Sequence, residues 1–203
     1  GRDRGTHGRG AGSPAPPPPP KIAPIERRTL TNGLRVWIVQ MHEVPVVDVS
    51  VVVTSGATAD PVVKYGLASF TAAMLDEGAG KYNALELADA VEFLAASLTT
   101  ASSFDSSVMN LHTPASKLDQ ALSLLADVVL RPTFPLNEID RIRKERLAAL
   151  LQARDNPASI AAAGFARLVY GAGHRYGTPT MGTESSNGRV VADQKRGFLP
   201  AYY

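Results

Sequence analysis

The spacing of apolar residues changes between residues 46 and 77, and this change constrains the fold most. Valines occupy every second position from Val47 to Val53 within the stretch Val46–Thr54, and this alternation predicts a half-buried strand. From Leu67 to Glu77 the apolar side chains recur at intervals of three and four residues, which predicts an amphipathic helix. The chain must therefore combine strands with helices.

The remaining segments extend this alternation of strands and helices along the chain. Arg28–Thr31 and Leu34–Gln40 flank an Asn32-Gly33 pair, which predicts a hairpin and, together with residues 46–54, three antiparallel strands. Further strands are expected at 97–103 and 104–113. Further helices are expected at 84–95, 118–130, 137–154 and 157–170, and Ser116 with Asp119 is expected to form a capping box at the start of the second of these. A loop at 171–190 and an amphipathic stretch at 191–203 follow. This order predicts an α+β fold, an antiparallel sheet with helices packed on one face.

Residues 1–24 differ in composition from the rest of the chain. They are rich in Gly, Arg and Pro, include the run Pro16 to Pro20, and cannot bury enough apolar surface to fold. We interpret them as a disordered linker, with a polyproline ligand as the alternative. Residues 25–203 are expected to form one domain, since 44% of the chain is hydrophobic.

Charge and cysteine content exclude several classes of function. The net charge of +2 includes +3 from residues 1–21, so the folded region is close to neutral and nucleic acid is not an expected partner. The absence of cysteine excludes disulfides, thiolate metal sites and cysteine nucleophiles. No stretch approaches the roughly 18 apolar residues of a membrane span, so none is expected in this chain.

Five short motifs occur in an order and spacing that resemble one peptidase family. They are Leu30-Thr31-Asn32-Gly33-Leu34-Arg35-Val36, Gly66-Leu67-Ala68, Arg131-Pro132-Thr133-Phe134, Asp155-Asn156-Pro157 and His174-Arg175-Tyr176-Gly177. Together they are similar to the N-terminal domain of the inverted-motif zinc peptidases, which include insulinase, pitrilysin and the mitochondrial processing peptidases. The resemblance covers residues 26 to 203 and implies a metallopeptidase-like domain.

The same resemblance shows which catalytic residues have been replaced. Active members carry His-x-x-Glu-His on the first long helix, where two histidines bind zinc and the glutamate activates the metal-bound water. Here Ser69 and Ala73 stand at the histidine positions and Ala72 at the position of the general base. The third ligand, a glutamate on a later helix, aligns with Ala149. The resemblance therefore implies no catalytic residue and no bound metal in this chain, with zinc only in an active partner.

Other side chains offer little catalytic chemistry. The four histidines are His7, His42, His112 and His174, and none has a second histidine three or four residues away. His174 is expected to be structural, and Ser69 lacks a nearby base that would make it a nucleophile. Asp76 and Glu77 are adjacent, so they do not face each other on a helix, and we interpret them as solvated charges.

Peptide binding is the function that the substitutions leave possible. In the family that the chain resembles, a substrate adds as a strand to an exposed sheet edge through backbone hydrogen bonds. The matching stretch here is Leu98-Thr99-Thr100-Ala101-Ser102, where active relatives have Asn-Ala-x-Thr. Leu98, Thr99, Thr100 and Ala101 are therefore candidate peptide-binding residues, with an ordinary strand end as the alternative.

The resemblance also implies a biological role. Members form chambers from repeated domains, and in some assemblies an inactive subunit closes over an active one. We expect this chain to be part of such an inactive subunit, truncated before a second homologous domain, that helps a zinc-bearing partner to enclose peptides. The alternatives are a zinc-dependent peptidase with an unrecognised site and a scaffold subunit of a larger complex. The Pro-rich residues 1–24 suit a protein of the bacterial periplasm or envelope, and equally a cytosolic linker.

Overall fold

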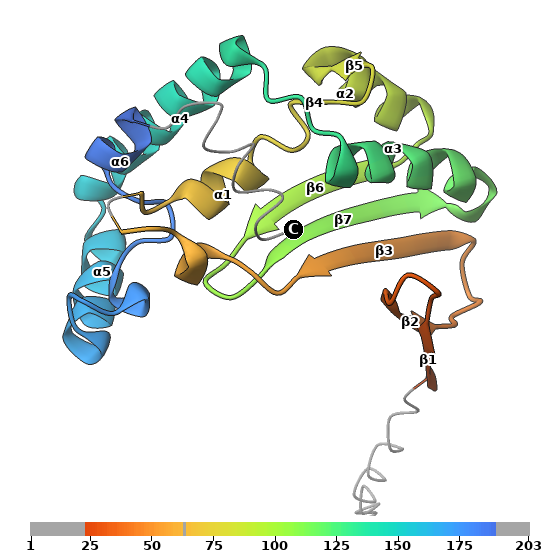
Figure 1. Cartoon of the computed structure of the whole chain (residues 1–203), viewed down its shortest axis with the longest axis horizontal. Coiled ribbons are helices and arrows are strands. Elements are labelled where there is room, and N and C mark those ends of the chain that lie inside the picture. The colour runs from red at the N-terminus through yellow and green to blue at the C-terminus, as the bar shows by residue number, and fades with distance from the viewer. Residues whose placement is uncertain (1–22, 63, 190–203) are drawn as a thin grey trace, which may run out of the picture. The chain divides into compact units, whose positions relative to one another are not determined.

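The computed structural model describes residues 23–62 and 64–189. The predicted linker, apart from its last two residues, and the predicted amphipathic stretch at 191–203 lie outside the described residues. The chain divides into two compact units, residues 1–44 and residues 45–203 (Figure 1).

The first unit contains one hairpin. Strands β1 (Ile25–Thr29) and β2 (Arg35–Val39) pair in antiparallel fashion. The turn between them is made as predicted, because Gly33 adopts φ +87° and Asn32 Oδ1 accepts from the backbone N–H of Leu34 at 3.1 Å. These two strands form a sheet of their own, and the third predicted strand, at 46–54, pairs elsewhere.

The second unit is built on a three-stranded antiparallel sheet. Its strands are β3 (Val46–Val53), β6 (Ser97–Ser102) and β7 (Ser107–Pro114), in the order β3-β7-β6. The strand predicted at 46–54 therefore pairs with β7, which lies far along the chain, because β7 offers an apolar row to match its valines.

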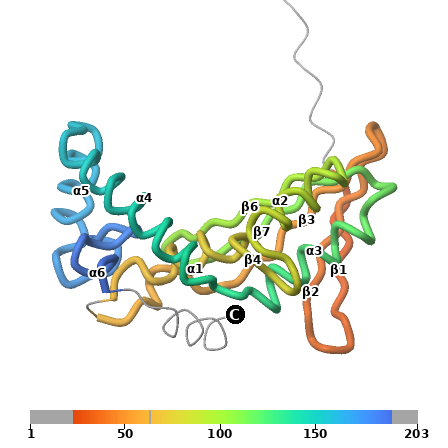
Figure 2. The backbone as a smooth tube through the Cα atoms, turned by 90° about the horizontal axis from the view of Figure 1, so that it is seen from above, coloured from red at the N-terminus to blue at the C-terminus, as the bar shows by residue number. Residues whose placement is uncertain are grey.

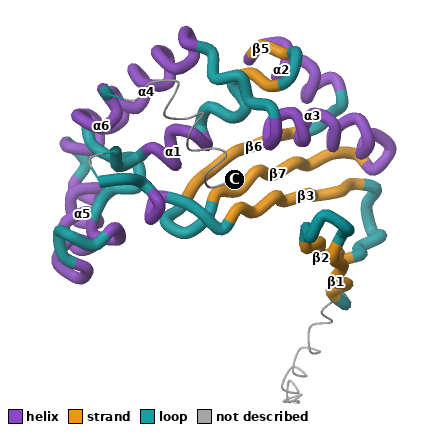
Figure 3. Tube along the Cα trace, viewed as in Figure 1, coloured by secondary structure: helices purple, strands orange, loops and turns teal. Residues whose placement is uncertain are grey.

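Three helices cover one face of this sheet (Figure 3): α1 (Leu67–Ala72), α2 (Ala84–Phe93) and α3 (Leu118–Leu130). The core between the layers is closed by fully buried side chains that include Phe70, Met74, Met109, Leu111 and Val128. The predicted α+β arrangement is confirmed.

Two helix boundaries differ from the predictions. Helix α1 ends at Ala72 rather than near Glu77, because the next bonds, from the N–H of Met74 to Thr71 and of Leu75 to Ala72, join residues three apart instead of four. Gly78, with φ +138°, could not continue a helix. A small hairpin of β4 (Gly78–Ala79) and β5 (Tyr82–Asn83) follows. The capping box predicted at Ser116 is wrong, because Ser116 lies in the 3-10 helix η2 (Ala115–Lys117) and α3 begins without a side-chain cap.

The remaining helices gather at one end of the second unit (Figure 2): α4 (Leu136–Arg154), α5 (Pro157–Tyr170) and α6 (Glu184–Gly188). Residues 171–190, predicted as loop, include α6 and the 3-10 helix η3 (Arg175–Gly177); a further 3-10 helix, η1 (Ala57–Ala59), precedes α1. In the described part of the chain, no helix has the length and apolar character needed to cross a bilayer.

Candidate functional site

The start of helix α1 is held by a buried carboxylate. Asp60 accepts from the backbone N–H of Gly66 at 2.7 Å and from that of Ala68 at 2.8 Å, so it satisfies two of the donors that a helix start leaves free. Gly66 has φ +93°, and a Cβ there would clash with the carbonyl oxygen of Met181. The backbone of α1 is thereby tied to the segment around residue 181.

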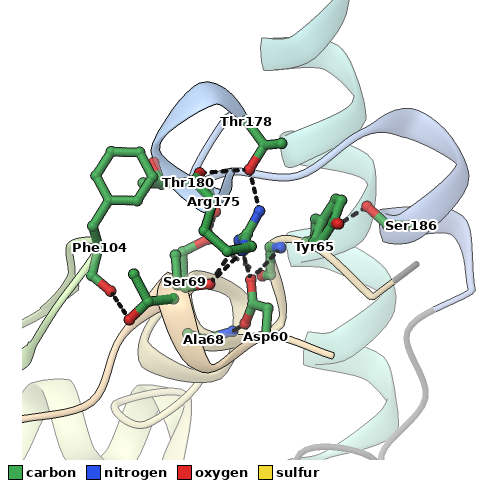
Figure 4. A network of polar contacts seen from close by, with 12 residues as sticks. Asp60, Tyr65, Ala68, Ser69, Phe104, Arg175, Thr178, Thr180 and Ser186 are labelled. Carbon is green, nitrogen blue, oxygen red and sulfur yellow. Dashed lines mark hydrogen bonds and ion pairs between the residues drawn. The ribbon is translucent and has the colours of Figure 1, made fainter. Parts of the chain in front are cut away.

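The three motif positions on α1 lie next to this segment. Ser69 and Ala73 are partly buried and Ala72 is buried. The hydroxyl of Ser69 donates to the carbonyl oxygen of Thr180 at 3.0 Å and accepts from Arg146 Nη2 at 2.7 Å (Figure 4 shows Ser69 beside Thr180). An arginine from α4 therefore occupies the space beside the first predicted ligand position.

Arg146 is the centre of this network. Its Nε donates to Asn187 Oδ1 at 2.9 Å, its Nη2 also donates to the carbonyl oxygen of Met181 at 3.0 Å, and its guanidinium lies 5.1 Å from the ring centroid of Phe70. Burial lowers the pKa of Arg146 to about 10, so the side chain is still a cation at neutral pH. Sequence reasoning missed Arg146; its only signal was its place one helical turn before Ala149.

The residues at this place do not fit a zinc ion. Zinc needs imidazole, thiolate or carboxylate donors. Ser69 offers a hydroxyl already engaged by Arg146, while Ala72, Ala73 and the partly buried Ala149 offer no donor at all. In residues 23–62 and 64–189 no group of three or more His, Cys, Asp or Glu side chains is placed to hold a metal ion.

A second arginine braces the other side of α1. Arg175 donates through Nε and Nη2 to the carbonyl oxygen of Ala57 at 2.8 and 2.7 Å, and its Nη2 lies 3.1 Å from Asp60 Oδ2. Figure 4 shows Arg175 facing Asp60, with Tyr65 alongside, whose ring centroid is 4.0 Å from the guanidinium. Burial raises the pKa of Asp60, and the two backbone N–H bonds and Arg175 oppose this rise.

The histidines in the described residues are not arranged around this network as a metal site. His174, as expected, is structural: its Nδ1 accepts from the backbone N–H of Tyr176 at 3.2 Å, and its ring stacks on Tyr170. His112 lies on the sheet face away from the helices, 2.7 Å from Asp48 Oδ1.

The interpretation of Asp76 and Glu77 as solvated charges is wrong. Both are partly buried, and Glu77 pairs with Arg141 on α4 at 2.5 Å. Burial is the main cause that raises the pKa of the Asp76 carboxyl. The adjacency of the two residues suggested exposure, because the sequence could not show that Arg141 on α4 reaches Glu77.

The predicted peptide-binding residues lie on β6, at an edge of the sheet. Among the described residues β6 pairs with β7 alone. Leu98 and Thr100 face the helices, and Thr100 Oγ1 donates to the carbonyl oxygen of Ala72 at 2.7 Å, whereas Thr99 and Ala101 face the opposite side. The edge strand therefore touches α1 directly at a motif position.

The hydrogen-bond pattern shows which backbone groups of β6 face outward. The N–H of Ser103 donates to the carbonyl oxygen of Ser106, and hydrogen-bonded pairs alternate along an antiparallel ladder. Thr99 and Ala101 are therefore bonded to β7, and the N–H and C=O groups of Leu98 and Thr100 point away from it. The outward groups belong to the same residues whose side chains face the helices.

Comparisons with known proteins agree with the resemblance. The family model described as insulinase (peptidase family M16) matches residues 35–181. The chain is 26% identical over 176 residues to an uncharacterized zinc protease of Mycobacterium leprae, a match that covers 87% of this chain and 39% of that protein. It is 24% identical over 179 residues to the uncharacterized zinc protease YmxG of Bacillus subtilis, covering 88% of this chain and 44% of that protein. The chain thus spans about two fifths of the length of these relatives.

One solved structure is similar at the level of both fold and sequence. The peptidase M16 inactive domain from Pseudomonas fluorescens superposes with a TM-score of 0.81 at 28% identity, covering 86% of this chain and 42% of that chain. The fold alone is also shared with the first half of the periplasmic protease PqqL from Escherichia coli.

Proposed function

The chain belongs to the insulinase family of peptidases, peptidase family M16, and we propose that it is a non-catalytic member that binds peptides along β6. We propose further that it acts beside an active, zinc-bearing homologue. Both steps go beyond family membership. The first rests on the arrangement around α1 and β6, and the second rests on chain length and similarity.

The contact between Arg146 and Ser69 carries the first step. The resemblance aligns Ser69 with a zinc ligand, and the Arg146 guanidinium lies 2.7 Å from the Ser69 hydroxyl. Zinc is a dication, so a positive charge beside this position supports the loss of the metal. Three alanines at the other motif positions leave no base to activate water. The hydrogen bonds of Arg146 around Ser69 instead join α1, α4 and the segment around residue 181.

The open edge of β6 supports peptide binding. The outward N–H and C=O groups of Leu98 and Thr100 can pair with an extended peptide without any metal. Thr100 anchors the strand to α1 through the carbonyl oxygen of Ala72, so the edge is held in place.

The role beside an active homologue rests on chain length and similarity. The chain spans about two fifths of its relatives, which leaves room in them for a further domain of similar size. The similar chain from Pseudomonas fluorescens is itself described as an inactive domain. Enclosing a peptide needs surface from two halves, whereas hydrolysis needs one metal site.

Metal content and peptide cleavage of the purified chain test the loss of catalysis. We expect no stoichiometric zinc by elemental analysis and no chelator-sensitive cleavage of a peptide library, with an active His-x-x-Glu-His homologue as positive control. Bound zinc with cleavage that stops on chelation would establish the alternative, a zinc-dependent peptidase with an unrecognised site.

A mixing experiment tests the partner role. The chain, extended to its full subunit, is added to a zinc-bearing homologue from the same source, and peptide cleavage is measured. We expect cleavage to rise on addition. Equal cleavage with and without the subunit contradicts the partner role.

An N-methyl scan tests binding along β6. A peptide added to this edge directs only alternate N–H groups toward it, so methyl groups on alternate residues should weaken binding while those between are tolerated. A response without this two-residue period contradicts pairing with the strand.

A further inference from the structure

A pocket lies at the start of β6, beside the edge to which a peptide would add. Its volume is about 290 Å³, and its lining comes from Asp76 in the turn that follows α1, from α2, and from residues 96–98 at the start of β6. Leu87, Val91 and Leu98 form apolar walls, and two carboxylates, Asp76 and Glu92, complete them. The lining includes no basic residue.

The backbone pattern directs a peptide side chain toward this pocket. Residues directly opposite one another on paired strands project their side chains to the same face of the sheet. Leu98 presents its backbone groups to the open edge, and its side chain faces the helices and lines the pocket. The peptide residue opposite Leu98 must therefore project its side chain toward α2, beside Leu98.

The chemistry of the pocket selects the kind of side chain. Lysine and arginine carry an aliphatic stem that packs on apolar walls and a cationic head that pairs with carboxylates. Asp76 is partly buried while Glu92 is exposed, so one carboxylate lies deep and the other at the rim. A glutamate or aspartate on the peptide would add a third negative charge to the pocket, beside the carboxylates of Asp76 and Glu92, and would be repelled.

The surroundings of Asp76 leave it able to receive a cation. Thr100 Oγ1 lies 3.5 Å from Asp76 Oδ1. Glu77, the adjacent carboxylate, is paired with Arg141, which is also bonded to Glu138 and Glu145. The charge of Arg141 acts on Asp76 as well and opposes the rise of its pKa that burial causes, but no ion pair joins the two side chains among the described residues. Burial raises the pKa of Asp76, and a peptide cation in the pocket would offset that cost by stabilising the carboxylate.

We infer that this pocket receives a lysine or arginine side chain from the peptide residue that pairs with Leu98. The inference rests on the proposed pairing of peptides with β6 and adds to it a preference for basic peptides. A basic residue at one fixed position, rather than overall positive charge, is what the pocket recognises.

The test uses the full chain and a labelled extended peptide with one variable position. Peptides with lysine, arginine, norleucine or glutamate at that position are compared by fluorescence anisotropy. We expect lysine and arginine to bind about tenfold more tightly than norleucine, and glutamate to bind most weakly. Moving the lysine by one residue should abolish the preference, because its side chain then projects to the other face.

Two variants and a matched control complete the test. Asp76→Asn and Glu92→Gln should each reduce the preference for lysine over norleucine to about threefold or less. Asp89→Asn removes the same charge from α2 at an exposed residue outside the pocket lining and should leave the preference unchanged. Circular dichroism confirms that each variant is folded, and Glu92→Gln decides the matter if Asp76→Asn does not fold.

The outcomes separate this inference from the proposed function. If peptides bind with the two-residue N-methyl period but lysine, norleucine and glutamate are equivalent, the basic pocket is refuted and binding along β6 stands. If no peptide binds, both fail.

Discussion

Arg146 and Ser69 are 77 residues apart in the chain, yet Arg146 Nη2 donates to Ser69 Oγ at 2.7 Å. The same guanidinium bonds Asn187 and the carbonyl oxygen of Met181, so one side chain joins α4, α1 and the segment that leads into α6. A hydrogen-bonded cation thus lies beside Ser69, the position that the family resemblance aligns with the first zinc ligand.

Removing the Arg146 side chain should destabilise the fold. Arg146→Ala leaves Asn187 Oδ1 and the Met181 carbonyl without this donor and removes packing over Phe70, so we expect a loss of about 2 to 4 kcal/mol in the free energy of unfolding. The matched control on α4 is Arg154→Ala, whose exposed pair with Glu184 should contribute no more than about 0.5 kcal/mol. Urea unfolding measures both, and equal losses would show that Arg146 is not a structural centre.

Restoring the family motif should not restore zinc binding while Arg146 is present. The variant Ser69→His/Ala72→Glu/Ala73→His/Ala149→Glu supplies the ligands and the base but keeps a guanidinium beside residue 69. Adding Arg146→Met removes that charge, and we expect at least about tenfold tighter zinc binding in the five-residue variant. Competition with a zinc-binding dye measures the affinities, and thermal unfolding checks the fold. Equal affinities would mean that Arg146 does not oppose the metal.

Two glycine substitutions should have opposite effects on stability. Gly66 has φ +93° and a Cβ there would clash with the Met181 carbonyl oxygen, so Gly66→Ala should cost about 2 to 4 kcal/mol. Gly164 lies within α5, and a Cβ added to it would meet no atom within 4 Å beyond the neighbouring backbone of its own helix, so Gly164→Ala should stabilise by about 0.5 to 1 kcal/mol. Urea unfolding measures the free energy of unfolding of both variants. A stabilising effect of Gly66→Ala would contradict the described contact with residue 181.

Binding of a lysine peptide should weaken on acidification. The peptide cation favours ionised Asp76, and protonation competes with it as the pH falls. Because burial raises the pKa of Asp76 above 3.8, the weakening should begin at a higher pH than for an ordinary aspartate. In Asp76→Asn the dependence on pH should be flatter, and since Glu77, Glu92 and Arg141 are present in both proteins, the difference reports Asp76. Parallel curves for the two proteins would contradict the role of this carboxylate.

Local patterns determined much of the fold. The alternating valines of β3, the Asn32-Gly33 turn and the helix that begins at Pro157 follow from side-chain spacing and backbone preference, which act over a few residues. The family resemblance is likewise readable from the chain, and it predicts that Ser69, Ala72, Ala73 and Ala149 stand at the positions of the zinc ligands and the general base. Each of these features depends only on residues that are close together in the sequence.

Tertiary structure alone decided the pairing and the surroundings of these elements. Periodicity shows that β3 has an apolar face but not that β7 is its partner, because strand pairing depends on residues about 60 positions away. Spacing likewise could not show that Asp76 is partly buried, or that the guanidinium of Arg146 reaches Ser69. Burial and charge pairing arise from contacts between distant segments. The sequence by itself determined which side chains stand at Ser69, Ala72, Ala73 and Ala149, and only the fold showed that Arg146 bonds Ser69.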